Sequence, residues 1–236
     1  MRDTTTVNAS HIINSWYIQS WIGTPPKPFY LLVDSGAPNL SIESTLAPKE
    51  KQGDSPMYDP SQSSTAQQLL GYTYSECYGS GYCDNGVVHT DVFTIGHVGL
   101  TNIPLLVRTN NNERATGIRT GNLGMNFDKR GMTTSPHKLP TYFESLIPFL
   151  DAPVWTVDWH ASPRTGQFQF GYIDSSKYVG DIAYGFVVTQ DHEWVIEVQS
   201  VQAGYDDADL NKVKFRVMLD TGTGGGTISR EIADLY

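Results

Sequence analysis

Two aspartates in this sequence have the surroundings expected of paired acid–base groups. Each follows a largely apolar run and precedes a small hydroxyl residue and a glycine, and the two copies of this pattern are Asp34-Ser35-Gly36 and Asp220-Thr221-Gly222. Two carboxyl groups that face each other cannot easily both ionise, so one can act as an acid while the other acts as a base. Such a pair could activate a water molecule without a metal ion.

The residues around each aspartate explain how the chain could present it. The runs 29–33 and 214–219 predict strands that lead into the two aspartates, and the glycine two positions later permits a sharp turn. The hydroxyl of Ser35 or Thr221 can bond locally or brace the opposite copy. Either triplet alone is explained by an ordinary turn that closes a strand. The two together predict a duplicated half-site.

The composition limits the class of protein. The chain has 236 residues, of which 39% are apolar, and a formal net charge of −9. This length suits one large domain or two small ones, and the charge argues against nucleic-acid binding. No apolar run is long enough for a membrane span, and residues 1–6 do not resemble a signal peptide, so we expect a mature or recombinant chain. The six histidines show no metal-binding spacing.

The two cysteines lie at the ends of a predicted hairpin tip. Cys77 and Cys83 flank residues 78–82 symmetrically, and the alternating pattern of residues 72–95 predicts a long hairpin with its tip at residues 79–81. The cysteines would then face each other, which permits a disulfide and indicates an oxidising compartment. Two buried free thiols are the alternative.

Several other elements can be predicted from local patterns. Residues 16–22 and 29–33 predict a hairpin across a Gly-Thr-Pro-Pro turn, and residues 39–42 predict a further strand. A short helix is expected at residues 140–147 with Thr141 as its cap, and another after Ser229. Strands are also expected at residues 182–189 and 194–201, with a turn at 205–209 before the second motif.

The two aspartate motifs are accompanied by further matches to one family. These are Tyr78-Gly79-Ser80-Gly81, Asn122-Leu123-Gly124-Met125 and the stretch 167–182. Together with the two aspartate motifs, they resemble the pepsin-like aspartic proteases. The resemblance implies an all-β, bilobal fold with a few short helices. It implies a first lobe at residues 1–171, a linker at 172–190 and the first part of a second lobe at 191–236.

The resemblance also implies roles for particular residues. Asp34 and Asp220 would be the catalytic pair, supported by the loop residues Ser35, Gly36, Thr221, Gly222 and Thr223. The hairpin tip would be a flap over the substrate, formed by Tyr78, Gly79 and Ser80. The implied activity is hydrolysis of a peptide or protein substrate, without a cofactor or metal, in a secreted or vacuolar/lysosomal-type acidic compartment. A pepsin-fold protein that binds partners, or that uses the pair for other acid–base chemistry, is the alternative.

The sequence departs from the family pattern at several positions. Ala37 stands where a serine hydroxyl usually bonds the first carboxylate, so we expect a higher pH optimum than in Ala37→Ser. Ser41 replaces a tryptophan that usually steadies the flap tyrosine, and residues 224–226 are three glycines. Most of the second lobe is absent by comparison with the family. We therefore expect either a companion chain that carries it or a sequence that is a fragment.

Overall fold

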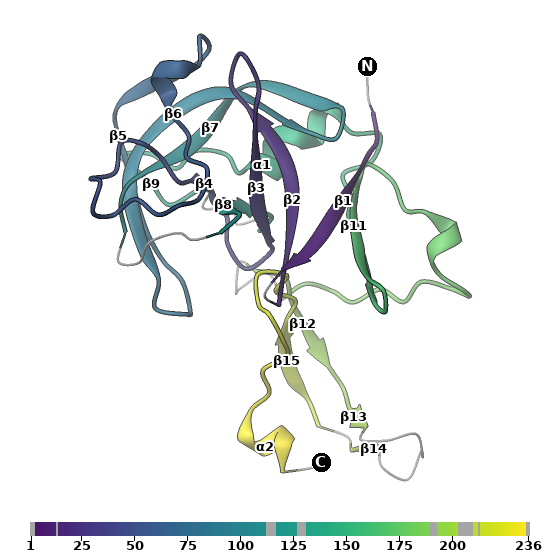
Figure 1. Cartoon of the computed structure of the whole chain (residues 1–236). Coiled ribbons are helices and arrows are strands. Elements are labelled where there is room, and N and C mark those ends of the chain that lie inside the picture. The colour runs from purple at the N-terminus through teal and green to yellow at the C-terminus, as the bar shows by residue number, and fades with distance from the viewer. Residues whose placement is uncertain are drawn as a thin grey trace.

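Strands are the predominant secondary structure of the described chain. The computed structural model describes residues 3–12, 14–111, 117–126, 131–188, 193–202, 210–211 and 213–234. In this part of the chain, eleven strands form one sheet in the order β10, β11, β1, β2, β3, β8, β4, β7, β6, β5 and β9 (Figure 1). Their bounds are β1 Thr5–Ile12, β2 Ser15–Ile22, β3 Lys27–Asp34, β4 Leu40–Ile42, β5 Gln67–Cys77, β6 Cys83–Ile95, β7 Val98–Asn111, β8 Arg119–Gly124, β9 Thr134–Ser135, β10 Trp155–Ala161 and β11 Arg164–Phe170. The all-β prediction is confirmed.

The middle of this sheet closes into a barrel. β2 pairs with β3 along most of its length and also pairs with β6 through residues 20–22. The strands from β3 to β6 follow in the order β3, β8, β4, β7, β6, so the extra pairing completes a ring and leaves these strands without a free edge. β3 and β8 run parallel, with Asp34 opposite Gly124 where both strands end. Asp34 therefore lies at one end of the barrel.

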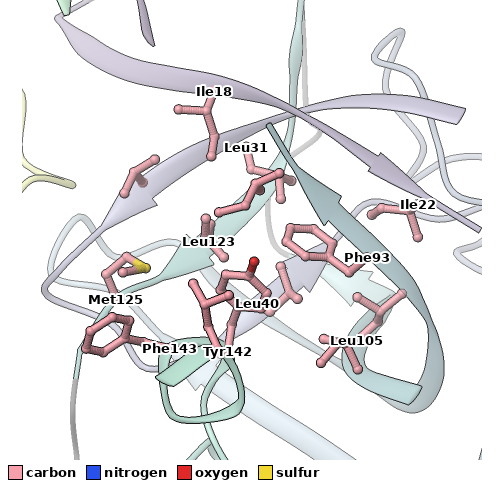
Figure 2. Packing of buried hydrophobic residues seen from close by; sticks show 14 of the residues in the cluster. Ile18, Ile22, Leu31, Leu40, Phe93, Leu105, Leu123, Met125, Tyr142 and Phe143 are labelled. Atoms are coloured by element: carbon pink, nitrogen blue, oxygen red, sulfur yellow. The ribbon is translucent and has the colours of Figure 1, made fainter. Parts of the chain in front are cut away.

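The barrel interior is filled by alternate side chains of its strands. Phe29, Leu31 and Val33 of β3 point inward and are almost completely buried, as the two-residue period of a strand requires. Figure 2 shows Leu31 close to Ile18 and Leu123 in this interior. This apolar contact holds the end of β3 in place and with it the position of Asp34.

A short helix covers part of the barrel. The helix α1 spans Tyr142–Leu146 and is followed by the 3₁₀ turn η2, Ile147–Phe149. The Thr141 hydroxyl accepts a hydrogen bond from the Glu144 N–H at 3.2 Å, and the Glu144 carboxylate accepts one from the Thr141 N–H at 2.8 Å. The predicted helix and cap are confirmed. The Tyr142 ring meets the Phe93 ring edge-on at 4.8 Å between centroids, so the helix is part of the core (Figure 2).

The long hairpin formed by β5 and β6 ends in a disulfide. Cys77 and Cys83 are opposite each other in the ladder, with 4.1 Å between their Cα atoms, and their sulfurs are bonded. Beyond them the Tyr78 N–H donates to the Tyr82 carbonyl at 2.8 Å, and Gly81 adopts a φ of +84° in the tight turn. The predicted cross-strand disulfide is confirmed, and the alternative of two free thiols is wrong.

The C-terminal part of the chain, from β12 (Val195–Val198) onward, extends from the barrel as a narrower arm. Two strands, β12 and β15 Phe215–Met218, pair and run downward from it, and the helix α2 Arg230–Ala233 lies at their far end (Figure 1). A second small pair consists of β13 Val201–Gln202 and β14 Leu210–Asn211. The Ser229 hydroxyl accepts from the Ile232 N–H at 3.3 Å, so the predicted cap of α2 is confirmed. The helices of the described residues are too short or too polar to cross a membrane.

The strand expected at residues 182–189 is not formed in the described part of that segment. Residues 182–186 have no ladder partner there, and Val187 makes only a single bridge to Ile196. Tyr184 and Phe186 are 83% and 97% exposed. The apolar side chains of this stretch therefore do not pack against another apolar surface of the described chain. The turn expected at 205–209 lies outside the described residues, and the lobe boundaries stay a prediction.

Candidate active site

The two aspartate loops meet face to face. Asp34 is the last residue of β3, and Asp220 comes two residues after the end of β15. A Cβ atom added to Gly36 would lie 2.8 Å from Oδ1 of Asp220, and one added to Gly222 would overlap the carboxylate of Asp34. Each glycine therefore lies against the aspartate of the opposite loop. Only a residue without a side chain leaves room for this approach.

Two hydrogen bonds join the loops reciprocally. The Ser35 N–H donates to Oγ1 of Thr221 at 3.0 Å, and the Thr221 N–H donates to Oγ of Ser35 at 2.9 Å. Each hydroxyl also donates across the junction, from Ser35 to the Leu219 carbonyl at 2.6 Å and from Thr221 to the Val33 carbonyl at 2.7 Å. Both hydroxyls are used as donor and as acceptor, so the two loops are fixed relative to each other. The structure thus brings the two predicted motifs together.

Each carboxylate also accepts a hydrogen bond within its own loop. The Gly36 N–H donates to Oδ1 of Asp34 at 2.9 Å, and the Gly222 N–H donates to Oδ1 of Asp220 at 2.8 Å. The second oxygen of Asp220 accepts from the Thr223 hydroxyl at 3.1 Å. At the position equivalent to Thr223, the first loop has Ala37, which has no hydroxyl to donate. Asp220 therefore has one more donor than Asp34 within these loops.

Burial and charge set the protonation state of Asp34. Asp34 is only 6% exposed, and desolvation followed by repulsion from the charge of Asp220 raises its pKa to about 7. The hydrogen bond from Gly36 and the charge of Arg119 act in the opposite direction but do not cancel these effects. Asp34 therefore holds a proton in mildly acidic solution. It can donate that proton to a bound group, which is the role of a general acid.

A cavity of about 540 Å³ lies over the two aspartates, with the hairpin tip on its wall. Its lining includes Tyr78, Gly79 and Ser80 of the tip, Leu32 and Asp34 of β3, and the loop residues Gly222 and Thr223. This volume is in the range of small-molecule and peptide side-chain sites. The predicted flap residues and the predicted catalytic pair therefore border one space. Among the described residues, no group of three or more histidine, cysteine or acidic side chains could hold a metal ion.

Comparison with known proteins identifies the family. The family described as "Eukaryotic aspartyl protease" matches residues 15–236. The chain belongs to the eukaryotic aspartyl protease family. It is 32% identical to podosporapepsin of Podospora anserina over 206 residues, which are 86% of this chain and 47% of that protein. It is 33% identical to penicillopepsin-1 of Penicillium janthinellum over 195 residues, which are 80% of this chain and 57% of that protein.

A solved structure shows the aspartyl protease fold as well. The crystal structure of an aspartic proteinase from Irpex lacteus superposes with a TM-score of 0.81 at 23% identity, and the match covers 99% of this chain and 67% of that one. The predicted family is therefore confirmed by sequence and its fold by structure. The chain spans about half the length of the curated relatives it matches.

This aspartyl protease chain also has a buried charge cluster that the sequence reasoning missed. Arg108 of β7 is fully buried, forms ion pairs with Glu43 at 2.6 Å and with Asp84, and donates to Oγ of Ser41 at 2.9 Å. Ser41 therefore binds the guanidinium at the position where the family usually has a tryptophan. A charged residue directly after the apolar run Leu105–Val107 was the available signal, because a lone charge in a buried strand needs a partner.

Proposed function

We propose that this protein is an aspartic endopeptidase that hydrolyses peptide bonds with Asp34 and Asp220. The observation that carries the proposal is the reciprocal bonding of Ser35 and Thr221, which holds the two aspartate loops face to face. The curated relatives are named as pepsins, in agreement with this activity. The sharing of a proton by two adjacent carboxyl groups is the established behaviour of aspartic proteases.

The chemistry follows from one ionised and one neutral carboxyl group. The ionised group removes a proton from a water molecule as the water oxygen forms a bond to the peptide carbonyl carbon. The neutral group gives its proton to the carbonyl oxygen. The raised pKa of Asp34 suits this residue to that role. When the tetrahedral carbon reforms its carbonyl, one of its two hydroxyl groups returns a proton to the ionised carboxylate, the C–N bond breaks, and the leaving nitrogen takes a proton from the pair. The pair then holds one proton again.

The surrounding residues support this reaction in distinct ways. Gly36 and Gly222 allow the close approach of the loops, while Ser35 and Thr221 fix it. Thr223 donates a hydrogen bond to the carboxylate of Asp220 and so holds it in place. Tyr78, Gly79 and Ser80 at the hairpin tip would cover an extended peptide in the cavity, and the Cys77–Cys83 disulfide holds the base of that tip closed.

Substitution of one aspartate tests the proposal. The natural protein should cleave extended peptides at acid pH, be inhibited by a statine-type peptide, and lose cleavage by at least about a thousandfold in Asp34→Asn or Asp220→Asn. The matched control is Asp151→Asn, because Asp151 is exposed and lies outside the cavity. Equal cleavage by Asp34→Asn and Asp151→Asn would overturn the proposal.

One observation favours a second candidate, a pepsin-fold protein without proteolysis. Asp34 lacks the hydroxyl donor that Thr223 supplies to Asp220, because residue 37 is an alanine. A binding protein would keep its partner in Asp34→Asn, whereas an enzyme that uses the pair for other acid–base chemistry would need Asp34 and leave peptides uncleaved.

The cellular setting is proposed from the disulfide. A bonded Cys77–Cys83 pair suits an oxidising compartment, so we propose a secreted or vacuolar/lysosomal-type location of acidic pH. The companion chain predicted from the sequence has no support from the comparisons. Intact mass and a non-reducing gel of the natural protein test for it: a second chain that co-purifies is expected if it exists, and a single species of one mass contradicts it.

A further inference from the structure

One cationic side chain faces the cavity above the aspartates. Arg119 is the first residue of β8 and lines this space together with Leu32 and Asn122. Among the described residues that line the cavity, Arg119 is the only arginine or lysine. A guanidinium is charged at every pH at which a protein is folded, so this wall of the cavity presents a permanent positive charge.

The strand register explains why Arg119 faces the cavity. Arg119 is paired with Tyr30 and Asn122 with Leu32, and the ladder shifts by one residue between them. Thr120 takes up the extra residue: its hydroxyl accepts from the Tyr30 N–H at 2.9 Å and donates to the Tyr30 carbonyl at 2.7 Å. Thr120 is thus completely buried while Arg119 remains half-buried at the cavity wall. Such a shift re-aims a side chain at the edge of a site.

Two arginines contact the same tyrosine ring but differ in how their charges are balanced. The guanidinium carbons of Arg108 and Arg119 each lie 5.4 Å from the centroid of the Tyr82 ring. Arg108 is paired with both Glu43 and Asp84, whereas no ion pair within 4 Å involves Arg119 in the described part of the chain. The contact with Tyr82 holds the Arg119 side chain in place, and within the described residues its hydrogen-bond donors are left for a ligand.

The acidic side chains in the cavity form no ion pair with Arg119 within the described residues, although the charge of Arg119 acts to lower the pKa of Asp34. Glu76 also lines the cavity, but its carboxylate accepts from the Asn39 side chain at 2.8 Å. Glu193 lines it too, and the described residues show no ion pair between Glu193 and Arg119. The charge of Arg119 does lower the pKa of Asp84, against the larger effect of burial, so a structural role for Arg119 must be tested as well.

The neighbouring Asn122 adds a second unsatisfied group. Its side-chain oxygen Oδ1 is buried and has no hydrogen-bond partner within the described residues, although Asn122 lines the cavity. A buried polar atom of this kind normally has a partner. A peptide N–H in the cavity would supply one, next to the donors of Arg119.

We propose that Arg119 is a specificity-determining residue that selects peptides with an acidic side chain next to the scissile bond. The inference rests on the proposed endopeptidase function and names its substrate class. An aspartate or glutamate side chain in the cavity would accept charge-assisted hydrogen bonds from the guanidinium, while its main-chain N–H would reach Oδ1 of Asn122. An amide side chain of the same shape would not gain the charge interaction.

Matched peptides test this selection in the natural protein. One set of peptides has glutamate or glutamine immediately before the bond that is cut, and a second set has it immediately after. Cleavage is measured near pH 5.5, which is above the ordinary pKa of glutamate of about 4.3. At one of the two positions, the glutamate peptide should be cleaved with a kcat/KM roughly tenfold higher than its glutamine counterpart. In Arg119→Gln this ratio should fall to about one. The control Arg164→Gln should keep the ratio, because Arg164 is exposed and outside the cavity.

The outcomes separate selection from structure and from the activity itself. A ratio of one in the natural protein, or a ratio that survives in Arg119→Gln, overturns the proposal. A purely structural role for Arg119 would reduce cleavage of both peptides equally, which also overturns it. If no peptide is cleaved, the proposed endopeptidase function fails instead. In that case, calorimetry measures how tightly the uncleaved glutamate and glutamine peptides bind, which tests the role of Arg119. Tighter binding of the glutamate peptide, lost in Arg119→Gln, supports the selection by Arg119. Equal binding of the two peptides overturns it.

Discussion

Ser35 and Thr221 each donate a backbone N–H to the side-chain hydroxyl of the other, at 2.9 to 3.0 Å, although 186 residues separate them along the chain. Both residues belong to the loops that carry the proposed catalytic aspartates. Their bonding makes the geometry of the pair depend on contact between two distant segments, and it is the basis of the first prediction.

Removal of the Thr221 hydroxyl should loosen this junction. Thr221→Val keeps the shape of the side chain but leaves the Ser35 N–H and the Val33 carbonyl without their partners, so we expect a loss of about 1–3 kcal/mol in the free energy of unfolding. Peptide cleavage should fall as well, because the two carboxyl groups lose their fixed separation. Thr221→Ser is the matched control and should retain most of both properties. Chemical denaturation and peptide kinetics check this prediction, and equal behaviour of the two variants would contradict it.

Addition of a hydroxyl at residue 37 should shift the pH dependence of cleavage. In Ala37→Ser the new donor would stabilise the ionised form of the nearby carboxyl group, which lowers the pKa of Asp34 from its raised value of about 7. The pH optimum of the natural protein should therefore lie above that of Ala37→Ser. The measurement is kcat/KM against pH for both proteins, with Ala37→Gly as a control that adds no hydroxyl. Superimposable profiles for the natural protein and Ala37→Ser would show the idea to be wrong.

The raised pKa of Asp34 also predicts how stability depends on pH. The folded pKa of about 7 lies above the value of about 3.9 in an unfolded chain, so between these values the folded protein binds more protons than the unfolded one. This contribution to stability is complete below about pH 4 and is lost as the pH rises towards about 7, by roughly 4 kcal/mol at most.

Asp34→Asn should remove this contribution, because an amide does not titrate. The difference in the free energy of unfolding between Asp34→Asn and the natural protein should therefore grow in favour of the variant as the pH rises from about 4 to about 7. Denaturation of both proteins at several pH values measures this difference, in which other titrating groups largely cancel. A difference that does not change with pH would contradict the assigned protonation state.

The buried Arg108 should be important for stability. Arg108→Met would leave the carboxylates of Glu43 and Asp84 buried without their cation, at a cost of about 3–5 kcal/mol. Arg164→Met is the matched control: Arg164 is exposed, so that variant should change stability by less than about 0.5 kcal/mol. Thermal unfolding of the two variants makes the comparison. A loss below about 1 kcal/mol in Arg108→Met would mean that the cluster is not held by the guanidinium.

Several features of this protein follow from neighbouring residues alone and could be predicted from the sequence. The cap of α1 is one, because Thr141 and Glu144 are three residues apart and bond within a single turn. The hairpin with its Cys77–Cys83 disulfide is another, since the alternating pattern on both sides places the cysteines opposite each other. The candidate catalytic aspartates also belong here, because each is marked by its own short motif.

Other features depended on contacts that no local pattern contains. The sequence predicted a strand at 182–189, but strand formation needs a partner, and Tyr184 and Phe186 have no such surface to cover in the described chain. The pairing of Arg108 with Glu43 and Asp84 and the position of Arg119 at the cavity depend on which strands become neighbours. The raised pKa of Asp34 depends on desolvation and on the charge of Asp220. The sequence alone therefore determined which residues are candidates for the chemistry, while tertiary structure decided their charges and partners, because burial and electrostatic interaction act through space.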